Sequence, residues 1–163
     1  MAADLSLLID QLNSSDVSQR LSACEKLGGL GPDSRPAAVS LCRLTGDPDE
    51  SVREAAVGAL ETLEAPAGED AAALGELLAL PSMDARYWAA TLLGRLGDQA
   101  GSQAAALLKA ISDDPEVAVR QKAVWAIDQI GLRTDTVKKT LEQAATSTDP
   151  RLARLAGKAL AKF

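Results

Sequence analysis

Few residues in this 163-residue chain could carry out chemistry. Histidine is absent, so the side chain best suited to proton transfer near neutral pH, also the commonest zinc ligand, is missing. Cys24 and Cys42 lack CxxC spacing, which favours two buried thiols over the alternatives of a disulfide or a reactive site. The acid pairs at 69–70 and 113–114 are typical of helix starts. We therefore expect no catalytic residue, no metal and no cofactor.

The composition predicts a folded, all-helical protein. Hydrophobic residues make up 47% of the chain, only four residues are aromatic, and alanine and leucine supply most of the apolar content. Met1 to Leu12 lack a basic start, and their longest apolar run covers only Leu7 to Ile9. We expect neither a secretory signal nor a membrane span. With two thiols that suit a reducing compartment, this predicts a cytoplasmic protein.

An internal repeat organises the whole sequence. Arg20, Arg53, Arg86 and Arg120 follow one another at intervals of 33, 33 and 34 residues. An alanine lies three places after each arginine, and Leu or Ile lies seven places after it. A period in this range is typical of stacked structural repeats.

Each repeat contains two predicted helices. Asp47-Pro48 and Asp114-Pro115 have the residue types that cap and open a helix. Gly28, Gly94 or Gly97, and Gly131 fall near the ends of the arginine-bearing helices, where glycine can terminate a helix. Because one helix pair cannot bury its apolar stripe alone, neighbouring pairs must stack. We predict a single domain spanning 1–163, with repeats at about 1–31, 32–66, 67–98, 99–132 and 133–163.

The segments 49–60 (DESVREAAVGAL) and 116–127 (EVAVRQKAVWAI) resemble the HEAT repeat, in the short-period variety named after phycobilisome lyases. The resemblance covers essentially the whole chain. It implies an all-α fold, a right-handed α-α superhelix (solenoid) of five helix-turn-helix HEAT-like repeats. It also implies that the arginines form a ladder with acidic groups of adjacent turns, for which Asp16, Asp49 and Glu116 are the candidates. The fifth repeat departs from the pattern, since Arg154 is one place late relative to Leu160.

The period of an α-helix separates core positions from spare positions in each arginine-bearing helix. The positions one before and three, six, seven and ten after the arginine cluster on one apolar side. In the second repeat these core positions are Val52, Ala56, Ala59, Leu60 and Leu63. The positions one, two, five and nine after the arginine face away from that side, and in the resembled family they line a concave surface.

Three of the four aromatic residues, Tyr87, Trp88 and Trp125, fall on spare positions. Exposed aromatic side chains are typical anchors for a partner. The alternative is that Trp88 packs between helices and only the other two are exposed. The predicted partner-binding residues are Tyr87, Trp88, Thr91, Arg95, Lys122, Trp125, Gln129 and Lys158.

Charge is distributed unevenly along the chain. Residues 1–119 contain 8 basic and 19 acidic residues, net −11, whereas residues 120–163 contain 9 and 4, net +5. A solvated pattern without function is one interpretation. The other is a partner with apolar and acidic groups that docks toward the C-terminal half.

These observations predict a non-catalytic scaffold that binds a protein or peptide through the concave second-helix face. The alternative, implied by the resemblance, is a bilin lyase-like or chromophore-binding subunit, in which Trp88 and Trp125 stack a tetrapyrrole and Arg95 or Lys122 meets its propionates. The net charge of −6 disfavours nucleic acid as a partner. A homodimer through the solenoid ends remains open.

Overall fold

The helices of this chain begin at capping side chains. In the computed structural model, which describes residues 2–163, the Asp16 carboxylate accepts a hydrogen bond from the Ser18 amide at 2.8 Å. The side chains of Asp49, Ser82 and Asp149 accept amide hydrogen bonds in the same way at the starts of later helices. Such bonds satisfy amides that have no partner inside the helix, and each contributes about 1 kcal/mol to stability.

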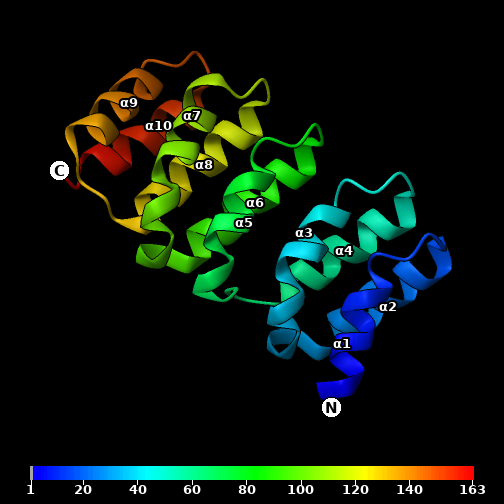
Figure 1. Cartoon of the computed structure of the whole chain (residues 1–163). Coiled ribbons are helices and arrows are strands. Elements are labelled where there is room, and N and C mark those ends of the chain that lie inside the picture. Colours follow the sequence, from blue (N-terminus) through cyan, green and yellow to red (C-terminus); the bar gives the residue numbers. More distant parts are fainter. Residues whose placement is uncertain (1) are drawn as a thin grey trace. The chain divides into compact units, whose positions relative to one another are not determined.

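Five helix pairs follow one another along the chain, as the repeat predicts (Figure 1). Met1, which opens the first predicted repeat, lies outside the described residues. Three short 3₁₀ segments, η1 (Gly31–Ala37), η2 (Gly68–Asp70) and η3 (Gly97–Gln103), precede the first helices of the second, third and fourth pairs. The pairs are α1 (Ala2–Gln11) with α2 (Val17–Leu30), α3 (Ala38–Leu44) with α4 (Glu50–Thr62), α5 (Ala71–Leu77) with α6 (Met83–Leu96), α7 (Ala104–Asp113) with α8 (Val117–Ile130), and α9 (Asp135–Ala145) with α10 (Pro150–Leu160).

The helices pack as two compact units, an N-terminal unit up to Asp70 and a C-terminal unit from Ala71. In the N-terminal unit, α2 packs against α4, with α1 on α2 and α3 on α4. In the C-terminal unit, α6 packs against α8 and α8 against α10, while α5, α7 and α9 each pack on the second helix of their own pair (Figure 1). The second helices are therefore neighbours within each unit. The prediction of a single domain stays a prediction.

The core of each unit consists mainly of alanine and leucine. All five core positions predicted in α4, namely Val52, Ala56, Ala59, Leu60 and Leu63, are buried. The helix α6 is the most enclosed, because ten of its 14 residues are buried. Small side chains at these positions let neighbouring helices approach closely, which suits a stack of repeats.

The repeated arginines make the same contact in four successive loops. In each case Nη1 donates to two backbone carbonyls that lie six and five residues before the arginine. Arg20 and Arg86 also hold a carboxylate of the following repeat: Asp47 lies 2.8 Å from Nε of Arg20, and Asp114 lies 2.7 Å from Nε of Arg86. The loops between paired helices are therefore tied to the second helices by arginine.

The structure corrects the predicted partners of this ladder. Asp16 and Asp49 are N-caps, and Glu116 occupies the N-cap position of α8; none of these three pairs with a ladder arginine. The ion-pair partners are Asp47 and Asp114, which the sequence assigns to helix capping. Their carboxylates instead accept the backbone N–H two residues later, just before each helix begins.

One of the predicted helix stops is also wrong. Gly28 lies inside α2, which is capped by Gly31 (φ 55°), whereas α6 is capped by Gly97 (φ 60°), one of the two glycines predicted there. Gly131, with φ 78°, ends α8 as predicted. A positive φ is strained for other residues, so the helix stops at the glycine that can adopt it.

The two cysteines are free and buried, as the favoured interpretation of the sequence has it. Burial raises the pKa of the Cys24 thiol to about 11 and that of the Cys42 thiol to about 12. Both side chains therefore stay protonated near neutral pH, and they pack as small apolar groups.

Within residues 2–163, every helix is too short or too polar to cross a lipid bilayer.

Candidate partner-binding site

The two neighbouring helices α6 and α8 carry the three aromatic residues that the sequence assigns to a binding face. Ser82 caps the start of α6, and its hydroxyl accepts the Ala85 amide at 3.3 Å. The helix α8 begins after Glu116. Because α6 and α8 pack against each other, residues on their facing turns can come together (Figure 1).

The ammonium group of Lys122 on α8 lies over two aromatic rings. Its Nζ is 4.9 Å from the ring centroid of Tyr87 on α6 and 4.8 Å from that of Trp125 on α8. Both distances are within the range of about 6 Å at which a cation is attracted by the face of a ring. Lys122 therefore joins the aromatic rings of the two helices into one cluster.

Trp125 lies across α6 at a position where that helix has no side chain. A methyl group added at Gly94 would come within 2.3 Å of Cζ3 of the Trp125 ring. Gly94 is itself buried, whereas Trp125 is half-buried. The indole thus packs one face against the backbone of α6 and keeps part of its surface accessible.

Trp88 adopts the packed alternative of the two that the sequence leaves open. It is only 9% exposed, and its ring lies edge-on to that of Tyr87 at a centroid distance of 6.3 Å. The guanidinium carbon of Arg95 lies 5.6 Å from the Trp88 ring centroid. Trp88 is therefore a buried member of the cluster that contacts Tyr87, whereas Tyr87 and Trp125 are its accessible aromatic members.

The spare position of Thr91 predicts that it lies on an open face, but the structure buries it. It is 6% exposed, and its hydroxyl donates to the backbone carbonyl of Tyr87 at 2.9 Å. The helix α6 has neighbours on several sides, so a position opposite its main apolar stripe is still covered. Gln129 and Lys158 are exposed as predicted, but neither lines the hollow described next.

A hollow of about 230 Å³ opens beside the cluster, between α6, α8 and α10. Its walls combine aromatic, aliphatic and cationic groups. Gln121 closes one side, because its side-chain amide donates to the Asp149 carboxylate of the next repeat at 2.8 Å. The residues that line the hollow are Tyr87, Ala118, Gln121, Lys122, Trp125, Arg151 and Leu155.

The charge of this hollow is positive on one side. Lys122 and Arg151 line it, and Arg154 is exposed on the same helix as Arg151. Asp149, the partner of Gln121, is not a lining residue; it accepts hydrogen bonds from the Leu152 amide and from Gln121, and these bonds hold its pKa below the usual value. Asp149 thus stays ionised and engaged in capping α10. The hollow suits an acidic group beside an apolar one.

Three of the lining residues, Tyr87, Lys122 and Trp125, are among the predicted partner-binding residues. Gln121 and Leu155 occupy spare positions but were not among them, and Ala118 and Arg151 were missed. Ala118 and Arg151 lie two places before the arginine position of their repeats, which in α10 is held by Ala153: its amide bonds to Asp149 as the other arginine amides bond to their cap residues. At about 100° per residue, the position two before falls between positions two and five after. Counting backward as well as forward along the helix would have found both.

A family model of HEAT repeats matches residues 5–82 and again residues 71–161. No curated protein sequence matches the chain.

Several solved structures are similar to this chain. A designed armadillo repeat protein in complex with the peptide (KR)4 is 19% identical, with a TM-score of 0.67 over 99% of this chain and 82% of that one. The CpcE and CpcF complex of phycocyanin lyase from Nostoc sp. PCC7120 is 23% identical, with a TM-score of 0.66 over 97% of this chain and 64% of the other. An archaeal HEAT-like repeats protein from Thermococcus onnurineus NA1 is 15% identical, with a TM-score of 0.66 over 97% and 70%. At such identities the likeness concerns the fold alone, a helical repeat solenoid.

Proposed function

We propose, since the chain belongs to the HEAT repeat family, that it is a non-catalytic scaffold that binds another protein or a peptide through the second-helix face of its C-terminal unit. The observation that carries the proposal is the cluster of Tyr87, Lys122 and Trp125 beside the hollow between α6, α8 and α10. Neither aromatic ring is fully buried. The core does not require such large side chains at these positions.

Aromatic burial is the main source of affinity in this proposal. Covering a large apolar side chain contributes roughly 1.5–3 kcal/mol before the costs of ordering the partner are subtracted. Trp125 is already held against Gly94, and Tyr87 is held against Trp88, so little rotamer freedom remains to be lost on binding. Such prepositioned aromatic groups are typical of interface hot spots.

Charge gives the proposed site its selectivity. Lys122 and Arg151 line the hollow, and Lys158 and Arg154 are exposed on α10. A partner with an acidic side chain next to an apolar one would place its carboxylate near these cations and its apolar group against Trp125 and Leu155. Arg95, which lies over Trp88, fixes the support of the cluster and need not touch the partner.

The test is a selection of displayed peptides on the immobilised wild-type protein, followed by affinity measurement on the selected sequences. We expect enrichment of peptides in which Asp or Glu is adjacent to a large apolar residue. Trp125→Ala should weaken their binding by about tenfold or more, because truncation of a central aromatic anchor typically costs over 1 kcal/mol. Leu7→Ala, at an exposed leucine of α1, is the matched apolar control and should bind as the wild type does.

Two variants that each remove one cation test whether positive charge contributes to binding. Lys122→Gln should weaken binding, and the loss should shrink at high salt, whereas Lys139→Gln removes one exposed cation from α9 and should have little effect. Equal binding by wild type, Trp125→Ala and Lys122→Gln would reject this face as the site.

Chromophore binding is the second candidate, and it too stays a prediction. It draws on the likeness to CpcE and CpcF, whose structure is described as that of phycocyanin lyase. A bilin stacked on Trp125 would change its visible absorbance on mixing, and Trp125→Ala would remove the change. An unaltered bilin spectrum would reject chromophore binding and would leave the proposal of protein or peptide binding unaffected.

A cytoplasmic location, the lack of nucleic-acid partners and a homodimer through the helix-pair ends remain predictions from the sequence. Light scattering behind a sizing column checks the last of these, because a dimer would double the mass of 16.9 kDa calculated from the sequence.

A further inference from the structure

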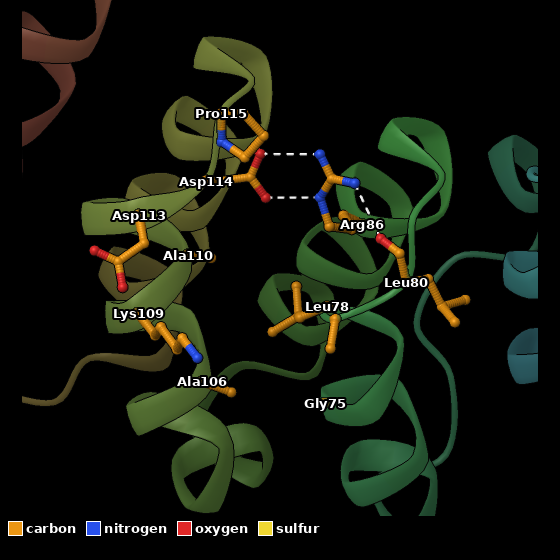
Figure 2. Close-up of a pocket in the computed structure, with 11 residues that line it drawn as sticks. Gly75, Leu78, Leu80, Arg86, Ala106, Lys109, Ala110, Asp113, Asp114 and Pro115 are labelled. Atoms are coloured by element: carbon orange, nitrogen blue, oxygen red, sulfur yellow. Dashed lines mark hydrogen bonds and ion pairs between the residues drawn. The ribbon is translucent and has the colours of Figure 1, made fainter.

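The ladder arginines offer two different edges for hydrogen bonding. Nη1 of each of the four donates to two carbonyls of its own loop. The opposite edge, formed by Nε and Nη2, is the one that Arg20 and Arg86 use to hold a carboxylate of the next repeat. For Arg86 the distances to Asp114 are 2.7 and 3.1 Å, and Figure 2 shows this two-bond contact together with the bond to the Leu80 carbonyl.

Arg120 has the first edge in use and the second edge open. Its Nη1 bonds to the carbonyls of Asp114 and Pro115, as the pattern requires. The residue that corresponds to Asp47 and Asp114, six places before the arginine position of the following repeat, is Ser147. Across residues 2–163, Nε and Nη2 of Arg120 donate to no side chain and Arg120 joins no ion pair.

Ser147 makes the backbone hydrogen bond of the missing aspartate but cannot form its ion pair. Its hydroxyl accepts the Asp149 amide at 3.1 Å, as Asp47 accepts the Asp49 amide and Asp114 accepts the Glu116 amide, both at 2.9 Å. The turn before α10 is therefore kept. The negative charge that Asp47 and Asp114 present to Arg20 and Arg86 is absent at Ser147.

Asp149 does not take over that role. Its carboxylate accepts the Leu152 amide at 2.6 Å and the side-chain amide of Gln121 at 2.8 Å, which direct it to the start of α10 and to α8. Arg120 contributes only a lesser part of the lowering of the Asp149 pKa, and the two groups form no ion pair. The cation of Arg120 thus keeps a free edge.

A hollow of about 220 Å³ lies beside Arg120, between α7, α9 and the loop that leads into α10. It corresponds to the larger hollow in Figure 2 between α5 and α7, where Asp114 occupies the guanidinium edge of Arg86. Around Arg120 the polar lining consists of hydroxyl and amide groups and contains no carboxylate. The lining residues are Ile111, Ser112, Arg120, Thr140, Gln143, Ala144, Ser147 and Leu152.

We propose that the hollow at Arg120 binds an oxyanion, either a carboxylate or a phosphate group, on the Nε and Nη2 edge of its guanidinium. The geometry that the site offers is the one that Arg20 and Arg86 already use for a carboxylate. A planar guanidinium binds such groups through two parallel hydrogen bonds, and Ser112, Ser147 and Gln143 can donate to the remaining oxygens. This site shares no residue with the aromatic hollow of the proposed function, so the two can fail independently.

The test follows the Arg120 Nε–H signal by NMR while sodium phosphate or sodium acetate is titrated at constant ionic strength. We expect a saturable shift in the wild type. A response to acetate alone assigns the site to carboxylates, a response to phosphate alone assigns it to phosphate groups, and a response to both supports an oxyanion site without preference. The absence of a saturable shift with either anion would overturn the proposal.

Two matched variants identify the edge that is used. Ser147→Asp introduces the aspartate that lies at the corresponding positions 47 and 114 and should occupy Nε and Nη2 from within, weakening anion binding by at least about tenfold. Thr148→Asp introduces the same charge at the next, exposed residue and should leave more of the response intact. If Ser147→Asp and Thr148→Asp lose anion affinity equally, general charge repulsion explains the loss and the proposed edge is wrong.

Discussion

The second-helix faces of the N-terminal and C-terminal units differ, although the helices beneath them are built alike. In α2 and α4, Gly29 and Gly58 have open space where a side chain would start, and Glu25 and Glu54 are exposed. The corresponding helices of the C-terminal unit carry the aromatic and cationic cluster. Both units keep a buried alanine and leucine core and an arginine-aspartate pair. The repeat thus fixes the core and the ladder and leaves the spare positions to differ in function.

The variants Arg20→Ala and Arg86→Ala test whether the arginine-aspartate pair stabilises the two units to the same extent. Each variant leaves an aspartate of low exposure without its charge partner, which should lower the free energy of unfolding. Urea unfolding followed by circular dichroism measures the loss. Arg35→Ala, in a pair whose side chains are 49% and 65% exposed, is the control and should cost less than about 1 kcal/mol. A small loss of stability in only one of the two variants would show that the pair does not stabilise both units in the same way.

The units can be followed separately because their natural probes do not overlap. Both cysteines lie in the N-terminal unit and both tryptophans in the C-terminal unit. With a pKa of about 11 for Cys24 and about 12 for Cys42, thiol labelling at pH 8 should be slowed roughly 100-fold or more relative to the unfolded chain. Labelling at the unfolded rate in native buffer would contradict the burial of the thiols.

The same probes test the prediction of a single domain. If the chain unfolds as one cooperative domain, cysteine exposure and tryptophan fluorescence change at one urea concentration. Two separate midpoints would assign an independent stability to each unit.

Two equivalent glycines sharpen the contrast between the faces. Gly28 and Gly94 both lie eight places after the repeat arginine. A methyl group at Gly94 meets Trp125 at 2.3 Å, whereas one at Gly28 meets only Ala59, at 3.4 Å. We expect Gly94→Ala to displace the indole, shift its fluorescence and cost about 1–3 kcal/mol, and Gly28→Ala to be neutral or to stabilise by up to about 1 kcal/mol. Thermal unfolding and fluorescence spectra of the two variants decide this.

The smallest expected effect is the loss of stability at low pH, which we expect to act through the Arg20–Asp47 pair of the N-terminal unit. Burial by itself raises the pKa of Asp47, but hydrogen bonds from Arg20 and from the Asp49 amide outweigh burial and hold it below its ordinary value. Its contribution to stability is therefore present above the unfolded value of about 3.9 and is lost as the pH falls through the lower folded value. The free energy of unfolding, measured between pH 6 and 2, should fall less steeply in Asp47→Asn than in the wild type. Identical slopes would contradict this assignment.

The sequence predicted the helix pairs, the core of α4 and three of the residues that line the aromatic hollow, because these follow from the period of a single helix. It predicted the wrong ladder acids, since two acids lie within three residues in the loop at Asp47 and Asp49 and both suit a cap. Only the packing of one repeat on the next shows which carboxylate reaches the arginine. The burial of Thr91 was missed for a related reason: a helical wheel describes one helix, and α6 has several neighbours.

The bonds from each ladder arginine to carbonyls only five and six residues away have a consequence for the order of folding. They can form as soon as one loop and the first turn of the next helix exist, before any neighbouring repeat is present. Contacts of such short sequence separation form quickly, so any of the first four repeats can act as a nucleus from which the rest assembles.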